Sequence, residues 1–170
     1  MAVLRREQQS LDRETPRSSL EEIERAILQI SWLSQRQFMQ LLDEERFRIT
    51  VPQFYTLLHL HQMAEECKMS DLAEATQQSA ASLTGVIDRL LEKNLVERTR
   101  HERDRRQVMV AVTPQGSKLI AAIKEARREQ IQAALAHLQF DDVDTLMRLL
   151  NRVLEGMHRV LDGGENGRWA

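Results

Sequence analysis

Apolar residues recur at intervals of three and four along most of the chain, which is the spacing of one face of an α-helix. This spacing predicts helices over residues 20–43, 50–64, 69–75 and 79–94, and two long helices between 117 and 162. Only 3 Pro and 6 Gly interrupt a chain rich in good helix formers. The sequence therefore predicts a mostly α protein.

Two short segments break the helical pattern. Residues 95–100 and 107–112 carry Val and Thr residues that are favoured in strands, and the charged residues 101–106 between them are typical of a hairpin. The predicted fold class is therefore mostly α with a small two- to three-stranded β wing.

The predicted helix at 79–94 has two different faces. Ser79 is a suitable N-cap, and Asn94 tolerates the left-handed conformation that often follows a helix end. A turn of about 100° per residue separates an apolar face from a small and polar one. The apolar face holds Leu83, Val86, Ile87 and Leu90, and the other face holds Ala81, Ser82, Gly85, Asp88 and Arg89. Small residues on that second face would let the backbone approach base edges closely.

The order helix, turn, helix and hairpin suits duplex DNA, because a major groove about 12 Å wide accepts one helix while a hairpin reaches beside it. The formal net charge of -2 means that DNA binding needs a local basic patch. Residues 93–106 provide one, with six Lys or Arg residues against three acids. Contacts from these residues to phosphates would make binding steeply salt-dependent.

Other functions find little support in the sequence. No pattern typical of a nucleophile with its base, a phosphate loop, a dinucleotide site or a metal site is present, so we expect a protein that is not an enzyme and has no cofactor and no metal. His59, His61 and Cys67 do not have the spacing of a metal site, and a redox role for Cys67 is not favoured. No apolar run is long enough to cross a bilayer, and no signal peptide is evident, so we expect a cytoplasmic protein without a membrane partner.

Several motifs between residues 71 and 116 resemble the MarR family of regulators. The similar positions are Asp71-Leu72-Ala73-Glu74, Ser79, Thr84, Asp88-Arg89-Leu90, Lys93-Asn94-Leu95-Val96-Glu97-Arg98, Asp104-Arg105-Arg106 and Val112-Thr113-Pro114-Gln115-Gly116. The pair Asp104 and Arg106, with a Thr-x-x-Gly shortly after it, is fairly specific among winged helices. Asn94 stands where the family usually has Gly. The resemblance covers about residues 50–120 in motif and the whole chain in helix order.

This resemblance implies a winged helix-turn-helix with long N- and C-terminal dimerisation helices, assembled as a homodimer on a pseudo-palindromic operator. The wide apolar faces of the terminal helices agree with a homodimer, since such faces need a partner. The expected domains are an arm (1–18), an N-terminal dimerisation helix (19–48), the DNA-binding domain (49–116), C-terminal dimerisation helices (117–162) and a flexible tail (163–170).

The expected partner is double-stranded DNA, and a wing arginine is expected in the minor groove, with Arg106 matching the motif arginine. Which of the wing arginines lies at the tip depends on the hairpin register. The candidate DNA-binding residues are Gln77, Gln78, Ser79, Ala81, Ser82, Thr84, Arg89, Arg103, Asp104, Arg105 and Arg106.

The resemblance further implies a repressor released by a small aromatic or phenolic effector. Such an effector would bind in a crevice beside the DNA-binding domain, with Trp32, Phe38, Phe54 and His59 as candidates to line it. The alternative is a winged-helix module that binds another protein and has no specific affinity for DNA.

Overall fold

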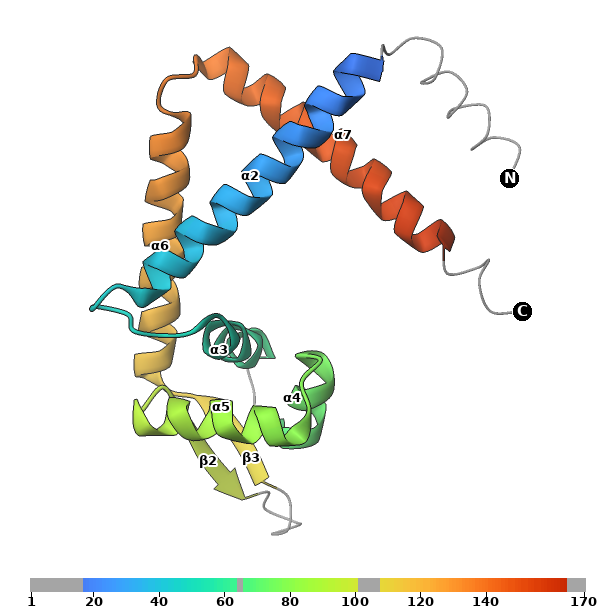
Figure 1. Ribbon diagram of the computed structural model, residues 1–170. Helices are drawn as coiled ribbons and strands as arrows, with labels where there is room; N and C mark the ends of the chain where they lie inside the picture. Colours follow the sequence, from blue (N-terminus) through green and yellow to red (C-terminus); the bar gives the residue numbers. More distant parts are fainter. Residues whose placement is uncertain (1–16, 64–65, 101–107, 165–170) are drawn as a thin grey trace. The chain divides into compact units, whose positions relative to one another are not determined.

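The computed structural model describes residues 17–63, 66–100 and 108–164 (Figure 1). The chain forms two compact units, one up to Arg127 and the other from Arg128 onward. The first unit contains the helix-turn-helix and the sheet, and it carries all the candidate DNA-binding residues that are described.

Among the described residues, four helices lie wholly in the first unit and a fifth begins there. They are α2 (Arg17–Asp43), α3 (Val51–Met63), α4 (Met69–Ala75), α5 (Ala80–Glu92) and α6 (Pro114–Leu135). The strands are β1 (Cys67–Lys68), β2 (Val96–Arg100) and β3 (Val108–Val112). This element order confirms the predicted fold class of a mostly α chain with a small β wing.

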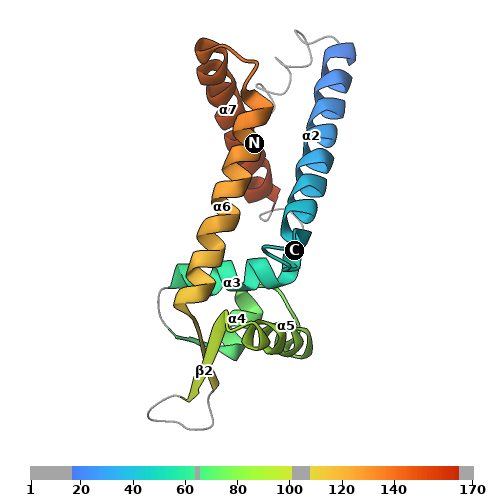
Figure 2. The ribbon, with the colours of Figure 1, turned by 90° about the vertical axis from the view of Figure 1, so that its left-hand side faces the viewer.

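The three strands form an antiparallel sheet in the order β1-β3-β2. Val110 in the central strand lies opposite Arg98 on one side and Cys67 on the other. Figure 2 shows β2 extending away from α3 at the end of the first unit opposite α2. Cys67 lies between the predicted helices 50–64 and 69–75, and no strand was predicted there, because a strand of two residues is too short to show alternation and forms only by pairing with β3.

Local hydrogen bonds explain why several helices begin where they do. The backbone N–H of Gln53 donates to Thr50 Oγ1 (3.4 Å) and that of Thr50 donates to Gln53 Oε1 (3.0 Å), which is a reciprocal capping arrangement at the start of α3. Ser79 Oγ accepts from the backbone N–H of Ser82 (3.2 Å), and this confirms Ser79 as the N-cap of α5. Asn94 has φ of 55°, as expected for the residue that follows the helix.

Helix ends differ from the predicted ones at both ends of the chain. Helix α2 begins at Arg17, so Arg17 and Ser18 belong to the helix and not to the expected arm. Helix α7 (Phe140–Gly164) continues two residues past the predicted limit of 162. The apolar repeat defines a helix interior, whereas its last turn depends on backbone hydrogen bonds that the repeat does not report. The rest of the expected arm and tail lies outside the described residues.

The core of the first unit is assembled from every element around α5. Leu83, Ile87 and Leu90 are fully buried, and Val86 is 8% exposed, which confirms the predicted apolar face of α5. They pack in one cluster with other fully buried side chains, which include Leu41, Leu42, Leu57, Leu72, Val110, Ile120 and Ile123. The core therefore fixes which face of α5 turns outward.

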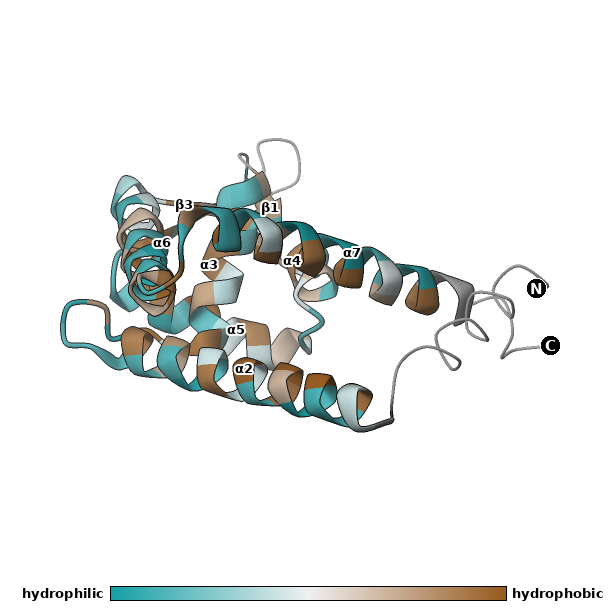
Figure 3. Ribbon diagram, turned by 90° about the horizontal axis from the view of Figure 1, so that it is seen from above, coloured by the Kyte–Doolittle hydropathy of each residue, from teal (hydrophilic) through white to brown (hydrophobic). Residues whose placement is uncertain are grey.

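The second unit contains the end of α6 and the whole of α7. Large apolar side chains of α7 are about half exposed or more, and they are Met147, Leu149, Leu150, Val153, Leu154, Met157, Val160 and Leu161. In Figure 3 the hydrophobic residues of α7 gather along one side of the helix. Among the described helices, none is both long enough and apolar enough to span a membrane.

Candidate nucleic-acid interface

Helices α4 and α5 are joined by a tight turn that sets the position of α5. Gln77 takes a left-handed backbone conformation with φ of 52°, and the backbone N–H of Gln78 donates to the carbonyl of Ala73 (3.0 Å). The Gln78 side chain donates from Nε2 to Thr56 Oγ1 on α3 (3.0 Å). Hydrogen bonds thus join the turn both to α4 and to α3, and they fix the position at which α5 begins.

The outward face of α5 consists of small and polar side chains. Ala81, Ser82, Gly85, Asp88 and Arg89 are all exposed, as the helical repeat predicted, and Thr84 is exposed as well. A Cβ atom added at Gly85 would have no atom within 4 Å, so packing inside this chain does not require glycine there. Glycine in a helix interior destabilises it by about 1 kcal/mol relative to alanine. Glycine at position 85 leaves the surface of α5 without a side chain, and this lets another molecule approach the helix backbone closely.

The hydroxyl groups of this region have distinct local roles. Ser79 acts as the helix cap described above, and Thr84 donates its hydroxyl to the carbonyl of Ala80 (2.8 Å). Thr84 Oγ1 keeps lone pairs that can accept a further hydrogen bond. Ser82 lies exposed near the N-terminus of α5, where helix backbone N–H groups favour negatively charged groups such as phosphates.

An ion pair connects α5 to the wing strand β2. Arg98 Nη2 on β2 lies 2.7 Å from Asp88 Oδ1 on α5, and both side chains are partly exposed. The positive charge of Arg98 offsets the negative charge of Asp88 on the outward face of α5. The pair could not be predicted from the sequence, because the two residues are ten positions apart and only the folding of β2 against α5 brings them together.

The predicted wing residues Arg103, Asp104, Arg105 and Arg106 lie outside the described residues. Arg100 pairs with Val108, so the two wing strands end opposite each other in register. The DNA contacts of the four predicted wing residues therefore stay a prediction.

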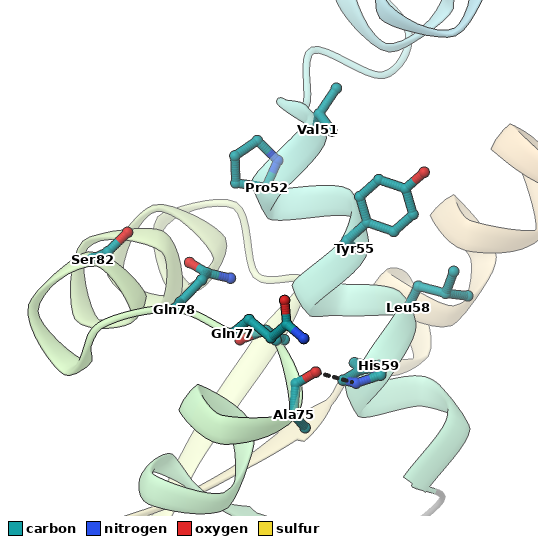
Figure 4. A pocket seen from close by; sticks show the side chains of 10 residues that line it. Val51, Pro52, Tyr55, Leu58, His59, Ala75, Gln77, Gln78 and Ser82 are labelled. Carbon is teal, nitrogen blue, oxygen red and sulfur yellow. Dashed lines mark hydrogen bonds between the residues drawn. The ribbon is translucent and has the colours of Figure 1, made fainter. Parts of the chain in front are cut away.

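The structure does not bring the four candidate effector residues together. Phe38 and Phe54 are buried in the core at 6% and 5% exposure, where their rings meet edge to face at 5.1 Å between centroids. Trp32 lies on an exposed part of α2, with the Arg36 guanidinium 5.2 Å from its ring centroid. Of the four, His59 is the one that lines the hollow between α3 and the α4–α5 turn. The candidate DNA-binding residues Gln77, Gln78 and Ser82 line the same hollow (Figure 4).

Cys67 is a poor candidate for a reactive thiol. Its side chain is 4% exposed, and Sγ donates a weak hydrogen bond to the carbonyl of Lys68 (3.4 Å). Burial raises the pKa of the thiol, and the negative charge of Asp71 raises that pKa further. Within the described ranges, no group of three or more His, Cys, Asp or Glu residues could hold a metal ion.

The geometry defines a winged helix-turn-helix protein, and comparisons with known proteins specify the family. The MarR family model matches residues 49–108. An HTH-type transcriptional regulator of Mycobacterium leprae, ML2140, is 32% identical over 124 residues, which cover 69% of this chain and 85% of the regulator. The repressor NicR of Pseudomonas putida is 26% identical over 108 residues, which cover 64% of this chain and 68% of NicR.

A solved structure shows the same architecture. A mutant of the S. aureus protein MepR, bound to an oligodeoxyribonucleotide, superposes with a TM-score of 0.64 at 23% identity, covering 85% of this chain and 99% of that one. The chain belongs to the MarR family of transcriptional regulators. It is a DNA-binding regulator of transcription and not an enzyme.

Proposed function

We propose that this regulator binds a pseudo-palindromic operator as a homodimer and represses transcription until a small molecule releases it. The observation that carries this proposal is the outward face of α5, where Ala81, Ser82 and Gly85 form a low surface beside the exposed Arg89. Such a surface lets a helix backbone lie close to base edges, while a neighbouring arginine reaches a base or a phosphate.

A homodimer is supported by the apolar residues that the described chain leaves uncovered. Leu150, Val153 and Leu154 on α7 are each about half exposed, and α2 likewise exposes Ile23, Leu28 and Ile30. Exposed apolar residues in such number mark an interaction surface, and a second copy of the chain carries matching surfaces. Two-fold symmetry would place the recognition helices in major grooves about 10 bp apart.

Repression with release by an effector is supported by the likeness to NicR, which is described as a repressor. An effector changes DNA affinity only if it binds the DNA-incompetent conformation more tightly than the DNA-bound one. The ligand therefore needs a site whose geometry differs between these two conformations.

The test is a mobility-shift titration of the purified protein with the DNA upstream of its own gene, at low and high salt. The test variant replaces Arg103, Arg105 and Arg106 with Ala. A matched control replaces Arg25, Lys118 and Lys124 with Ala, which removes the same charge from exposed positions on α2 and α6.

The proposal expects specific binding that weakens steeply with salt, is lost in the wing variant and is retained in the control. Binding that both variants lose equally would show attraction by net charge alone. No binding to this DNA or to a pool of genomic fragments would favour a protein partner. A solution mass of one copy at micromolar concentration would contradict the homodimer.

A further inference from the structure

Hydrogen bonds join the C-terminal end of α5 to the start of α6. Three successive backbone carbonyls lie at this end of α5, those of Lys93, Asn94 and Leu95. The Asn94 oxygen accepts from Thr113 Oγ1 (2.7 Å), and the Leu95 oxygen accepts from the backbone N–H of Thr113 (3.1 Å). The Lys93 oxygen accepts from Gln115 Nε2 (3.4 Å). Thr113 and Gln115 therefore engage three carbonyls in a row.

The hydroxyl of Thr113 bonds to both helices. Besides donating to Asn94, Oγ1 accepts from the backbone N–H of Gly116 (3.0 Å), and this bond caps the N-terminus of α6. Gly116 is buried, and it lies so close to Leu95 that an added Cβ would be 2.2 Å from the Leu95 oxygen. The first turn of α6 thus packs directly against the backbone that follows α5. A movement of this turn would move the end of α5 with it.

The start of α5 is held by a different element. The Gln78 amide, which lies beside α3 in Figure 4, donates from Nε2 to Thr56 Oγ1 on α3 (3.0 Å). Helix α5 has 13 residues and is therefore about 20 Å long. Two attachments, one near each end, determine the direction of a helix of this length. The bonds from Gln78 and from Thr113 therefore set the tilt of α5 together.

The tilt of α5 matters more for contacts with bases than for contacts with phosphates. Hydrogen bonds weaken steeply outside the range of about 2.7–3.2 Å, and the short side chains of Ala81, Ser82 and Gly85 cannot extend to follow a shifted base. Phosphate contacts position a protein on DNA without reading sequence, and long charged side chains can follow a phosphate over a wider range. A change of tilt would therefore reduce sequence discrimination before it reduces attraction to DNA.

We infer that Thr113 is a positioning residue for base recognition, because its hydroxyl holds the end of α5 against the start of α6. The residue acts through the carbonyl of Asn94 and does not itself contact DNA. The inference rests on the proposed function, in which the outward face of α5 reads the operator.

The test variant is Thr113→Val, which keeps the shape of the side chain and removes the hydroxyl. Thr113→Ser restores the hydroxyl without the methyl group. The matched control is Thr50→Val, because Thr50 Oγ1 also accepts a capping N–H, from Gln53 (3.4 Å) at the start of α3. Within the described ranges, the Thr50 hydroxyl is not hydrogen-bonded to α5. Both Val variants lose a helix cap, so a similar fall in stability is expected in urea unfolding.

The measurement is the ratio of two affinities of the full-length protein, determined by mobility shift. One duplex is the site that the unchanged protein protects in the DNA upstream of its own gene, and the other has the same bases in shuffled order. Thr113→Val should lower the ratio by about tenfold, with the affinity for shuffled DNA and its salt dependence unchanged. Thr113→Ser should restore the ratio to within about threefold of the original, and Thr50→Val should keep it.

An unchanged ratio in folded Thr113→Val protein would overturn the inference. So would an equal loss in Thr50→Val, since reduced stability alone would then explain the result. If circular dichroism shows that Thr113→Val does not fold, the test passes to Gln115→Ala, which truncates an exposed side chain and removes the bond to Lys93. This variant should lower the ratio by about threefold, and an unchanged ratio would overturn the inference.

Failure of the proposed function has a different signature. The unchanged protein would then protect no site in its upstream DNA or in a pool of genomic fragments, and the inference would fall with the proposed function. Discrimination by the unchanged protein that Thr113→Val fully retains would overturn the inference alone.

Discussion

Arg98 on β2 and Asp88 on α5 form an ion pair with 2.7 Å between guanidinium Nη2 and carboxylate Oδ1. Their side chains are 36% and 49% exposed, respectively, so water and salt screen part of the attraction. The pair connects the wing sheet to the helix that carries the candidate base contacts. We therefore expect the pair to fix the position of β2 against α5 while contributing little to the free energy of unfolding.

A double-mutant cycle with Asp88→Asn and Arg98→Gln should give a small coupling energy. We expect roughly 0.2–1 kcal/mol in urea unfolding at low ionic strength, because that is the range of partly exposed ion pairs. The coupling should fall towards zero in about 1 M salt. The control cycle is Glu45 with Arg48, a 3.6 Å pair with side chains 89% and 71% exposed, and its coupling should be smaller. A larger coupling in the control pair would contradict this account.

Gly116→Ala should destabilise the protein. A Cβ at this position would lie 2.2 Å from the carbonyl oxygen of Leu95 and 2.9 Å from Cγ1 of Val112. The Leu95 oxygen also accepts from the backbone N–H of Thr113 (3.1 Å), so it cannot move without breaking that bond. Overpacking of this kind costs about 1–3 kcal/mol, and a denaturant titration measures it. Stability equal to that of the unchanged protein would show that the contact can relax.

Gly85→Ala should have the opposite effect on stability and still weaken DNA binding. The added Cβ meets open space, and alanine favours a helix by up to about 1 kcal/mol over glycine. On the face that is proposed to contact DNA, the methyl group would hold the backbone away from the bases, and we expect about a tenfold loss of operator affinity. Gly156→Ala, also in open space, controls for the gain in stability. Undiminished operator affinity of a folded Gly85→Ala protein would exclude close approach at this position.

Cys67 should react slowly with thiol reagents in the native protein. The raised pKa leaves the neutral thiol as the dominant form near pH 7, and only the thiolate is a good nucleophile. Labelling of the native protein with iodoacetamide should therefore speed up as the pH rises above the ordinary range of a thiol pKa. In urea, where the thiol is exposed, labelling should be fast at the same pH values. DNA affinity should not change after mild peroxide treatment. Rapid native labelling at pH 7 would contradict the burial of this residue.

Part of the candidate site followed from the sequence alone. The positions of Leu83 and Ile87 on the inner face of α5, and of Ala81 and Gly85 on the outer face, depend only on the 3.6-residue period of a helix. The caps at Thr50 and Ser79 depend on side chains that bond to the backbone three residues away. These relationships are local, so they can be predicted without knowing the fold.

The remaining features needed contacts between distant segments. Phe38 and Phe54 are aromatic residues of the kind expected in a ligand site, yet their rings pack against each other because α2 and α3 meet in the core. The hollow exists because His59 reaches Ala75, sixteen residues later, and Gln78 reaches back to Thr56. Pattern analysis cannot distinguish a core aromatic residue from a pocket residue, since both lie on an apolar helical face.

The sequence by itself determined the order of the helices and of the two wing strands, the two faces of α5 and the membership of the MarR family, because each of these depends on residue type at a fixed local spacing. The tertiary structure alone decided the pairing of β1, the ion pair of Arg98 with Asp88 and the hollow beside the recognition helix. These features depend on where separate elements pack, and that packing is determined by the whole core and not by any one segment.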